Sequence, residues 1–123
     1  SVAGVGDING DGYDDVIIGA PCIENNEIGY AYVLFGGQNM DNIPDLVFNG
    51  EAKYDLFGGM VAKAGDLNGD GSPDFMISAP GYPEVFDDSL GYWRGLGKGK
   101  VYIYFGGCAL DTIADVSIIG KED

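Results

Sequence analysis

The chain repeats itself, and this internal similarity limits the folds open to it more than any other feature. Three segments of the first half align with three segments of the second half in the same order. The pairs are 2–21 with 61–80, 29–37 with 99–107, and 40–50 with 110–120. The connection between the first and second of these segments is longer in the second half, where it spans 81–98, than in the first half, where it spans 22–28. A repeat of this kind indicates two copies of one supersecondary unit.

Each repeat contains four short apolar segments that are rich in β-branched and aromatic residues and bounded by Gly, Pro, Asn or Asp, which is typical of strands. The expected strands are 1–5, 15–20, 30–35 and 46–49 in the first repeat, and 58–64, 75–79, 100–105 and 116–119 in the second. The middle strands are apolar on both faces. In segment 30–35, for example, three Tyr and Leu side chains alternate with Ala, Val and Phe.

A four-stranded antiparallel sheet that is apolar on both faces is typical of a β-propeller blade, because neighbouring blades stack face to face. A β-sandwich would show one polar face on each strand. We therefore predict an all-β fold of two blades, 1–50 and 51–123, with the first strand of blade one truncated at the N-terminus and an insertion at 81–98. Two blades cannot close a ring, so we expect a larger propeller or a stacked assembly.

Between its first and second strands each repeat carries the acidic pattern Asp-x-Asn-x-Asp-Gly-x-x-Asp, at 7–15 and at 66–74. In such a loop the side-chain oxygens at positions 1, 3 and 5 converge, the carbonyl at position 7 adds a ligand, and the glycine permits a sharp turn. An all-oxygen, carboxylate-rich site favours Ca²⁺ over Mg²⁺ and over transition metals. The expected ligands of two Ca²⁺ ions are Asp7, Asn9, Asp11, Asp15 and the carbonyl of Tyr13, and Asp66, Asn68, Asp70, Asp74 and the carbonyl of Ser72.

Two other interpretations of these loops are open. Asn, Asp and Gly are also the residues of simple Asx turns, but the crowded acids would then repel one another without compensation. An EF-hand or dockerin loop starts in the same way, but an EF-hand needs an acidic twelfth ligand followed by a helix. Position 12 is Ile18 in one loop and Ile77 in the other. The sequence therefore predicts loops of β-hairpins.

The order of Phe57-Gly58, the acidic loop and Ala79-Pro80 resembles the FG-GAP repeat of integrin α-subunit propellers. The first copy keeps Gly19-Ala-Pro21. Its Phe-Gly pair would fall before Ser1 and is therefore absent from this sequence. The resemblance implies a calcium ion between the first two strands of each blade, an extracellular or cell-surface location, and binding rather than catalysis, usually on the face opposite the calcium loops. The implied partners are a protein or glycan ligand, or further blades of the same or other copies.

Integrin-like propellers are rings of seven blades, whereas this chain supplies two blades. Two hypotheses about its assembly follow. The chain is an excerpt of a longer repeat array, or it is the structural subunit of a calcium-dependent extracellular filament or coat built by blade stacking. Exposed apolar blade faces would aggregate or pair.

The formal net charge is -14, which disfavours a nucleic-acid partner or an anionic membrane surface. No apolar run has the length of a membrane span, so we expect no membrane insertion.

The chain has no histidine, which excludes Ser-His and Cys-His catalysis. A competing hypothesis is that the chain is part of a secreted hydrolase that uses a pair of carboxylates for catalysis. The acids are concentrated in the two loops, however, where calcium would occupy them. We therefore expect no enzyme and no catalytic residue.

The insertion contains residue types that are enriched at contact hot spots. The candidate partner-binding residues are Tyr82, Phe86, Tyr92, Trp93 and Arg94. Alternatively, these rings cover an open edge of the blade.

The two cysteines, Cys22 and Cys108, follow strands of opposite direction, so we expect no bridge between them within the chain.

Overall fold

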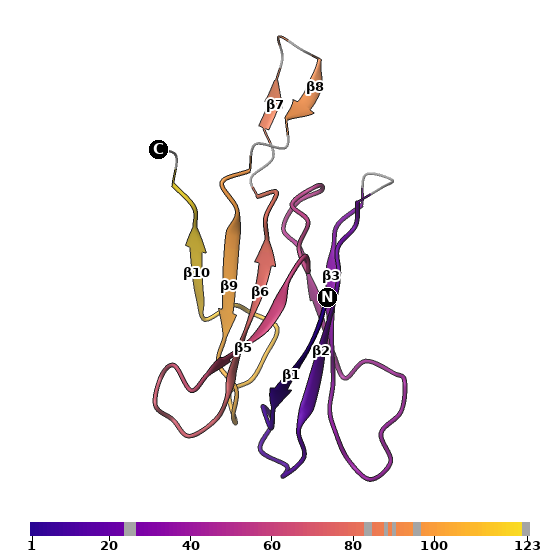
Figure 1. Cartoon of the computed structure of the whole chain (residues 1–123), viewed down its shortest axis with the longest axis vertical. Coiled ribbons are helices and arrows are strands. Elements are labelled where there is room, and N and C mark those ends of the chain that lie inside the picture. Colours follow the sequence, from indigo (N-terminus) through magenta and orange to yellow (C-terminus); the bar gives the residue numbers. More distant parts are fainter. Residues whose placement is uncertain (24–26, 83–84, 88, 90, 95–96, 122–123) are drawn as a thin grey trace.

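The computed structural model of the chain describes residues 1–23, 27–82, 85–87, 89, 91–94 and 97–121, and its regular secondary structure there consists of strands (Figure 1). The first sheet, blade one, contains β1 (Val2–Gly6), β2 (Asp15–Ala20), β3 (Tyr30–Leu34) and β4 (Leu46–Asn49) in that order. The second sheet, blade two, contains β5 (Val61–Gly65), β6 (Asp74–Ala79), β9 (Lys100–Tyr104) and β10 (Val116–Ile119) in that order. All neighbouring strands are antiparallel, which confirms the predicted fold class.

The pleat of the strands decides which side chains enter the core. On β3, Ala31 and Val33 are fully buried, while Tyr30 is exposed on the opposite face of the sheet. On β6, the buried Phe75 and Ile77 alternate in the same way with less buried residues. The inner faces of the two sheets share one apolar cluster, so the core of this chain is the space between its blades.

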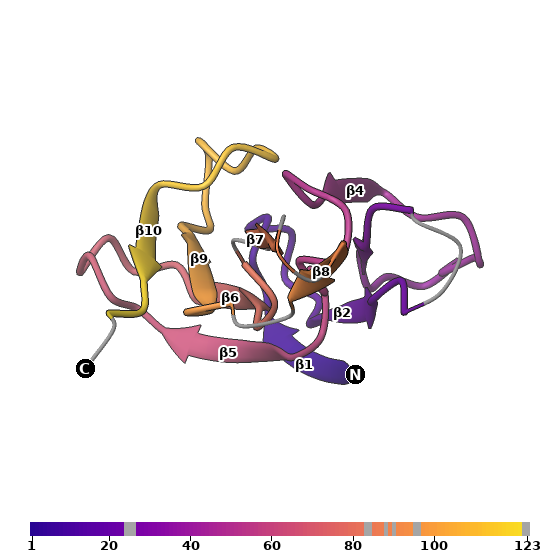
Figure 2. The ribbon, with the colours of Figure 1, turned by 90° about the horizontal axis from the view of Figure 1, so that it is seen from above.

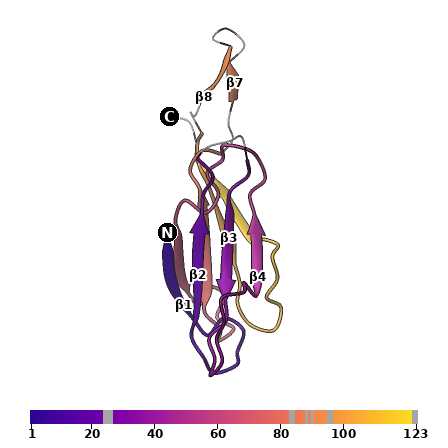
Figure 3. The same ribbon diagram turned by 90° about the vertical axis from the view of Figure 1, so that its right-hand side faces the viewer.

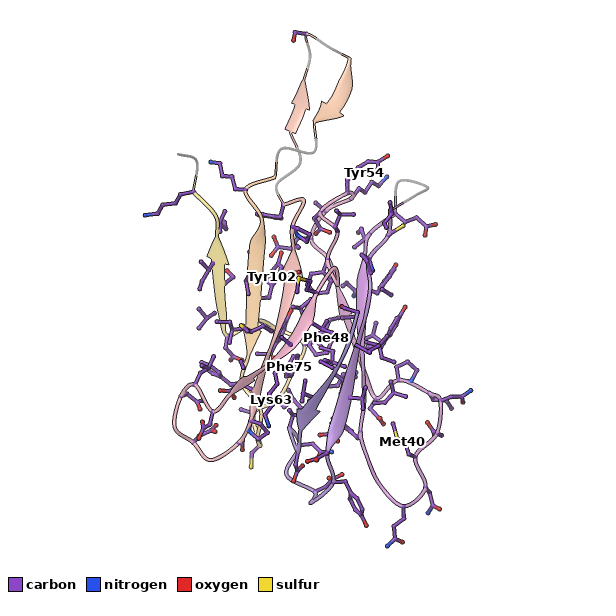
Figure 4. The ribbon with its side chains drawn as sticks, viewed as in Figure 1. Met40, Phe48, Tyr54, Lys63, Phe75 and Tyr102 are labelled. Carbon is purple, nitrogen blue, oxygen red and sulfur yellow. The ribbon has the colours of Figure 1, made fainter. Side chains whose placement is uncertain are left out.

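The two sheets are closest at β1 and β5, and they diverge toward β4 and β10 (Figure 2). Aromatic rings fill the wider part of this wedge, where Phe48 and Phe75 meet between the sheets (Figure 4). Phe48 of blade one contacts Phe75 and Tyr104 of blade two edge to face, at 5.6 and 4.8 Å between ring centroids. Such pairs add about 0.5–1.5 kcal/mol each beyond the area they bury.

The predicted start of the first strand of blade two, at residue 58, is wrong, because β5 begins at Val61. The residues before it form a turn. Leu56 and Gly58 both have a positive φ, of 57° and 85°, and the N–H of Gly59 donates to the carbonyl of Leu56. An extended strand cannot pass through two such residues. The other ends of the blade strands agree with the expected ranges to within one residue, whereas the two strands of the insertion, β7 (Val85–Asp87) and β8 (Tyr92–Arg94), were not predicted.

The insertion forms a hairpin of β7 (Val85–Asp87) and β8 (Tyr92–Arg94), with Phe86 paired to Trp93 in the backbone register. This hairpin projects beyond the ends of the blade strands (Figure 3). The acidic loops lie at the opposite end of the blades from the hairpin (Figure 1).

The outer face of each sheet carries exposed apolar side chains. On blade one these include Val2, Tyr30 and Val47, and on blade two they include Val116 and Ile118. Each blade therefore has one face covered by the other blade and one face open to solvent in this chain.

The connections that hold Cys22 and Cys108 leave β2 and β9 at opposite ends of the blades (Figure 1), and the two residues form no disulfide with each other. Within the described ranges, we find no helix with the length and hydropathy needed to cross a membrane.

Candidate functional site

The acidic loop of blade one, residues 7–15 (loop one), folds around the carboxylate of Asp7. One carboxylate oxygen of Asp7 accepts hydrogen bonds from the N–H groups of Gly10 and Asp11, at 2.8 and 3.0 Å, and the other accepts from Gly12 at 2.8 Å. Gly10 and Gly12 both have a positive φ, which lets the backbone curl so tightly. The loop therefore turns around the side chain at its first position.

The side chains at the third and fifth positions lie against each other in the same curl. The amide of Asn9 donates to a carboxylate oxygen of Asp11 at 3.1 Å, while its own oxygen accepts from the N–H of Asp11. The second oxygen of Asp11 accepts from the N–H of Tyr13 at 2.9 Å. Three oxygen-bearing side chains thus gather within one exposed turn.

Asp15, at the ninth position, lies at the base of loop one and is fully buried. Its two oxygens accept hydrogen bonds from the N–H of Ile8 and from the N–H of Gly36, both at 2.8 Å. Burial raises the pKa of this carboxyl, as do the nearby charges of Asp11 and Asp7, while the two backbone N–H groups lower it. Asp15 joins the loop to the turn that follows β3.

The acidic loop of blade two, residues 66–74 (loop two), repeats this geometry. Asp66 accepts from Gly69, Asp70 and Gly71 at 2.9, 3.1 and 2.9 Å. Asp70 accepts from the N–H of Ser72 at 2.8 Å and from the amide of Asn68 at 3.3 Å. Asp74 is fully buried and accepts from Leu67 and Gly106. The repeat in sequence is therefore also a repeat in hydrogen bonding.

The chemistry of this donor set fits a hard cation, since each loop offers carboxylate, amide and carbonyl oxygens and no nitrogen or sulfur ligand. In the described part of the chain, no three His, Cys, Asp or Glu side chains are close enough to form a metal site from those residue types alone. The loop oxygens accept backbone N–H groups instead, and a carboxylate has about four lone-pair sites, so acceptor capacity remains. The ten predicted ligands stay a prediction.

Phe57 and Gly58 form a second motif, which joins the blades. The backbone carbonyl of Gly58 lies only 2.1 Å from the place where a Cβ on Gly19 of blade one would stand. In the same way, a Cβ on Gly29 would stand 2.2 Å from the carbonyl oxygen of Phe57. The Phe57 side chain is buried and packs edge to face on Tyr102 at 5.2 Å. The glycines of blade one are thus needed for the close approach of the Phe-Gly turn.

Asp55 is a structural residue that the sequence analysis missed. It is fully buried, and its carboxylate accepts from the N–H groups of Glu51, Ala52 and Phe57 at 3.1, 3.2 and 2.8 Å. These bonds hold the turn that presents Phe57 to blade one. An Asp two residues before a Phe-Gly pair is a pattern for an Asx turn, and this signal was available in the sequence.

Of the five candidate partner-binding residues, only Tyr82 has a described side chain. The Nζ of Lys100 lies 4.6 Å from the ring centroid of Tyr82 and 4.6 Å from that of Tyr102. The same Nζ forms a 2.7 Å ion pair with Glu51, and this pair lowers the pKa of the Glu51 carboxyl. The side chains of Phe86, Tyr92, Trp93 and Arg94 lie outside the described residues, although their backbone forms the hairpin. Their proposed role stays a prediction.

Comparison with known proteins gives consistent matches. The FG-GAP repeat model matches residues 1–34 and 58–104. The chain is 36% identical to integrin alpha-6 of Homo sapiens over 104 residues, which cover 81% of this chain and 8% of that protein. It is 38% identical to integrin alpha ina-1 of Caenorhabditis elegans over 115 residues, 81% of this chain and 9% of that protein. It is 40% identical to integrin alpha-5 of Xenopus laevis over 81 residues, 60% of this chain and 8% of that protein.

The chain spans less than a tenth of the length of these relatives. The two matched segments contain both acidic loops, Gly19-Ala-Pro21 and Ala79-Pro80, and together they cover more than half of the chain. The resemblance in these motifs is therefore confirmed. The chain belongs to the FG-GAP repeat family, and its two sheets are blades of the integrin alpha type.

Proposed function

We propose that this chain is a calcium-stabilised binding module of an integrin-type propeller, located outside the cell or at its surface. The observation that carries the proposal is the repetition of one loop geometry in both blades, with side-chain oxygens at positions 1, 3 and 5 gathered in a single turn. A bound Ca²⁺ would be held by these oxygens and would offset the repulsion among the acids.

The buried acids support a binding role over a catalytic one. Among the described residues, the buried acids are Asp15, Asp55 and Asp74, and each accepts two or more backbone N–H groups. These carboxylates act as structural acceptors in loops and turns. Their hydrogen bonds fit a structural role, and the activity that we propose for the chain is recognition of a protein or glycan ligand.

Calcium titration tests the metal part of this proposal. Isothermal titration calorimetry of the chain with CaCl₂ is expected to show two bound ions, and an excess of a hundred times Kd should stabilise the fold by about 2.7 kcal/mol for each site. The double variant Asp11→Ala/Asp70→Ala should lose both effects. Magnesium chloride serves as the control cation. An unchanged melting temperature and no heat of binding would refute the proposal.

The location of the hairpin favours the end of the blades opposite the acidic loops as the binding surface (Figure 1). The test measures how much of each candidate ligand, protein or glycan, is retained on the immobilised chain. Retention by the hairpin variant Trp93→Ala is compared with retention by the control variant Ile43→Ala. Ile43 is an exposed apolar residue in the connection after β3, at the loop end of the blades. Loss of binding in the first variant alone supports this surface, and equal binding by both variants refutes it.

The exposed apolar outer faces of both blades favour a second candidate, a structural subunit that stacks on other copies. Light scattering and micrographs with and without a chelator decide between the two. Linear particles that disappear on chelation support the subunit, whereas a monodisperse 12.9 kDa monomer excludes it.

A further inference from the structure

The two acidic loops share their internal geometry but not their surroundings. At the second position of loop one, Ile8 is fully buried, while its counterpart Leu67 in loop two is 54% exposed. The paired hydrogen bonds inside the two loops differ by at most 0.2 Å, for example 3.1 Å for Asn9 to Asp11 against 3.3 Å for Asn68 to Asp70. The difference between the loops therefore lies outside them.

Blade two provides the extra contacts of loop one. The carbonyl of Ile8 accepts a 2.7 Å hydrogen bond from the N–H of Gly107, in the turn after β9. A Cβ on Gly6, just before the loop, would lie 3.2 Å from the ring of Pro73 in blade two. A Cβ on Gly65, the equivalent residue before loop two, would meet nothing within 4 Å. Loop one is thus docked on the neighbouring blade, and loop two is open on the corresponding side.

This docking acts on a residue that stands between predicted ligands. Ile8 lies between Asp7 and Asn9, and its N–H donates to Asp15 while its carbonyl accepts from Gly107. Its peptide groups therefore connect blade two to a predicted calcium ligand. A loop that is already held in one conformation loses less conformational entropy when it binds an ion.

We propose that loop one binds Ca²⁺ more tightly than loop two in this chain, because its contact with blade two holds it in the binding conformation. This inference rests on the proposed calcium function. By thermodynamic linkage, calcium in loop one strengthens the packing of the two blades by the same factor. Loop two gains an equal contact only when the turn of another blade covers Leu67.

Two single variants test the inequality, each leaving one loop intact. Asp70→Ala leaves the ligands of loop one intact, and Asp11→Ala leaves those of loop two intact. The two variants are matched, because Asp70 accepts from the N–H of Ser72 at 2.8 Å and Asp11 accepts from the N–H of Tyr13 at 2.9 Å. Calorimetric titration with CaCl₂ is expected to give a Kd about tenfold lower for Asp70→Ala, within the usual range of coupling between sites. Calcium should also raise the melting temperature of Asp70→Ala more than that of Asp11→Ala.

A second pair of variants truncates the side chain at the second position of each loop, which is buried in loop one and exposed in loop two. Adding Ile8→Ala to the Asp70→Ala chain should weaken its calcium affinity toward that of loop two, because the buried side chain is lost while the backbone hydrogen bond to Gly107 can remain. Adding Leu67→Ala to the Asp11→Ala chain should change its affinity by less than about twofold, because Leu67 has no blade beside it. Circular dichroism shows whether each variant folds. If Ile8→Ala does not fold, the comparison of the two single variants decides alone.

The outcomes separate this inference from the proposed function. Equal affinities of the two loops, or tighter binding by loop two, would overturn the inference and leave calcium binding established. Absence of calcium binding in the unmodified chain would refute both.

Discussion

The carboxylate of Asp74 accepts a 3.0 Å hydrogen bond from the backbone N–H of Gly106, 32 residues further along the chain. The other oxygen of Asp74 accepts from Leu67 at 2.6 Å, so one buried side chain joins the acidic loop of blade two to the turn after β9. Asp15 and Gly36 form the same contact in blade one. The ninth residue of the acidic pattern therefore has a structural role in addition to its predicted role as a metal ligand.

Replacing this carboxylate should destabilise the fold even without calcium. In Asp74→Asn one oxygen becomes an NH₂ group that cannot accept a hydrogen bond, so one buried backbone N–H loses its partner. We expect a loss of about 1–3 kcal/mol in the free energy of unfolding, measured by urea denaturation with a chelator present. The control is Asp14→Asn, an exposed acid in loop one, next to the equivalent residue Asp15. An equal effect of both substitutions would contradict the structural role.

The contact between the Phe-Gly turn and blade one should be intolerant of any side chain at Gly19. A Cβ there would stand 2.1 Å from the carbonyl oxygen of Gly58, which is backbone and cannot rotate away. We expect Gly19→Ala to lower the free energy of unfolding by about 1–3 kcal/mol, which thermal melting can detect. Gly37→Ala is the matched control, since its Cβ would meet nothing within 4 Å. A neutral Gly19→Ala would show that the blades can separate at this point without cost.

Equivalent residues of the two blades should differ in their effect on stability. Phe48 on β4 is 1% exposed and packs on blade two, whereas Ile118 holds the same position on β10 and is 57% exposed. Phe48→Ala should cost about 3–5 kcal/mol of unfolding free energy. Ile118→Ala should cost about 0.5 kcal/mol or less at protein concentrations where the chain is monomeric. Similar losses would mean that the outer face of blade two is buried in solution.

The ion pair of Glu51 and Lys100 should contribute to stability only above acidic pH. Lys100 lowers the pKa of Glu51 in the folded chain below its ordinary value of 4.5. The charged carboxylate therefore stabilises the fold above that ordinary value, and the contribution disappears as the pH falls through the lowered pKa. Because the Glu51 side chain is 47% exposed, solvent screening limits the contribution to about 1 kcal/mol or less.

The measurement for this pair is the difference in unfolding free energy between the unmodified chain and Glu51→Gln as a function of pH. The difference should be largest near neutral pH and should vanish in acid. Asp41→Asn, at an exposed turn, is the control for the many other carboxylates that titrate in the same range. A difference that grows as the pH falls would contradict the assigned sign.

Local pattern was sufficient to predict the strands and their pairing. Period-two alternation in segments such as 30–35 indicates an extended chain, and the glycine and proline residues between segments mark the ends. One exception was the start of β5, where the glycine of the Phe-Gly pair was predicted as strand but the pair is held in a turn. Its conformation depends on Asp55 and on contacts with Gly19 and Gly29 of the other blade, which no local pattern shows. The other exception was the insertion, where the strands β7 and β8 were not predicted.

The sequence by itself determined that the chain is a repeat of two all-β blades and that each blade carries one oxygen-rich loop, because both properties depend on the order of residue types along short segments. Only the tertiary structure decided which copy of each residue is buried. Ile8 and Leu67, or Phe48 and Ile118, occupy the same positions in their repeats, yet one of each pair is covered and the other is exposed. The physical reason is that burial depends on a neighbouring blade, and among the described residues each blade packs against the other on one face and carries exposed side chains on the opposite face.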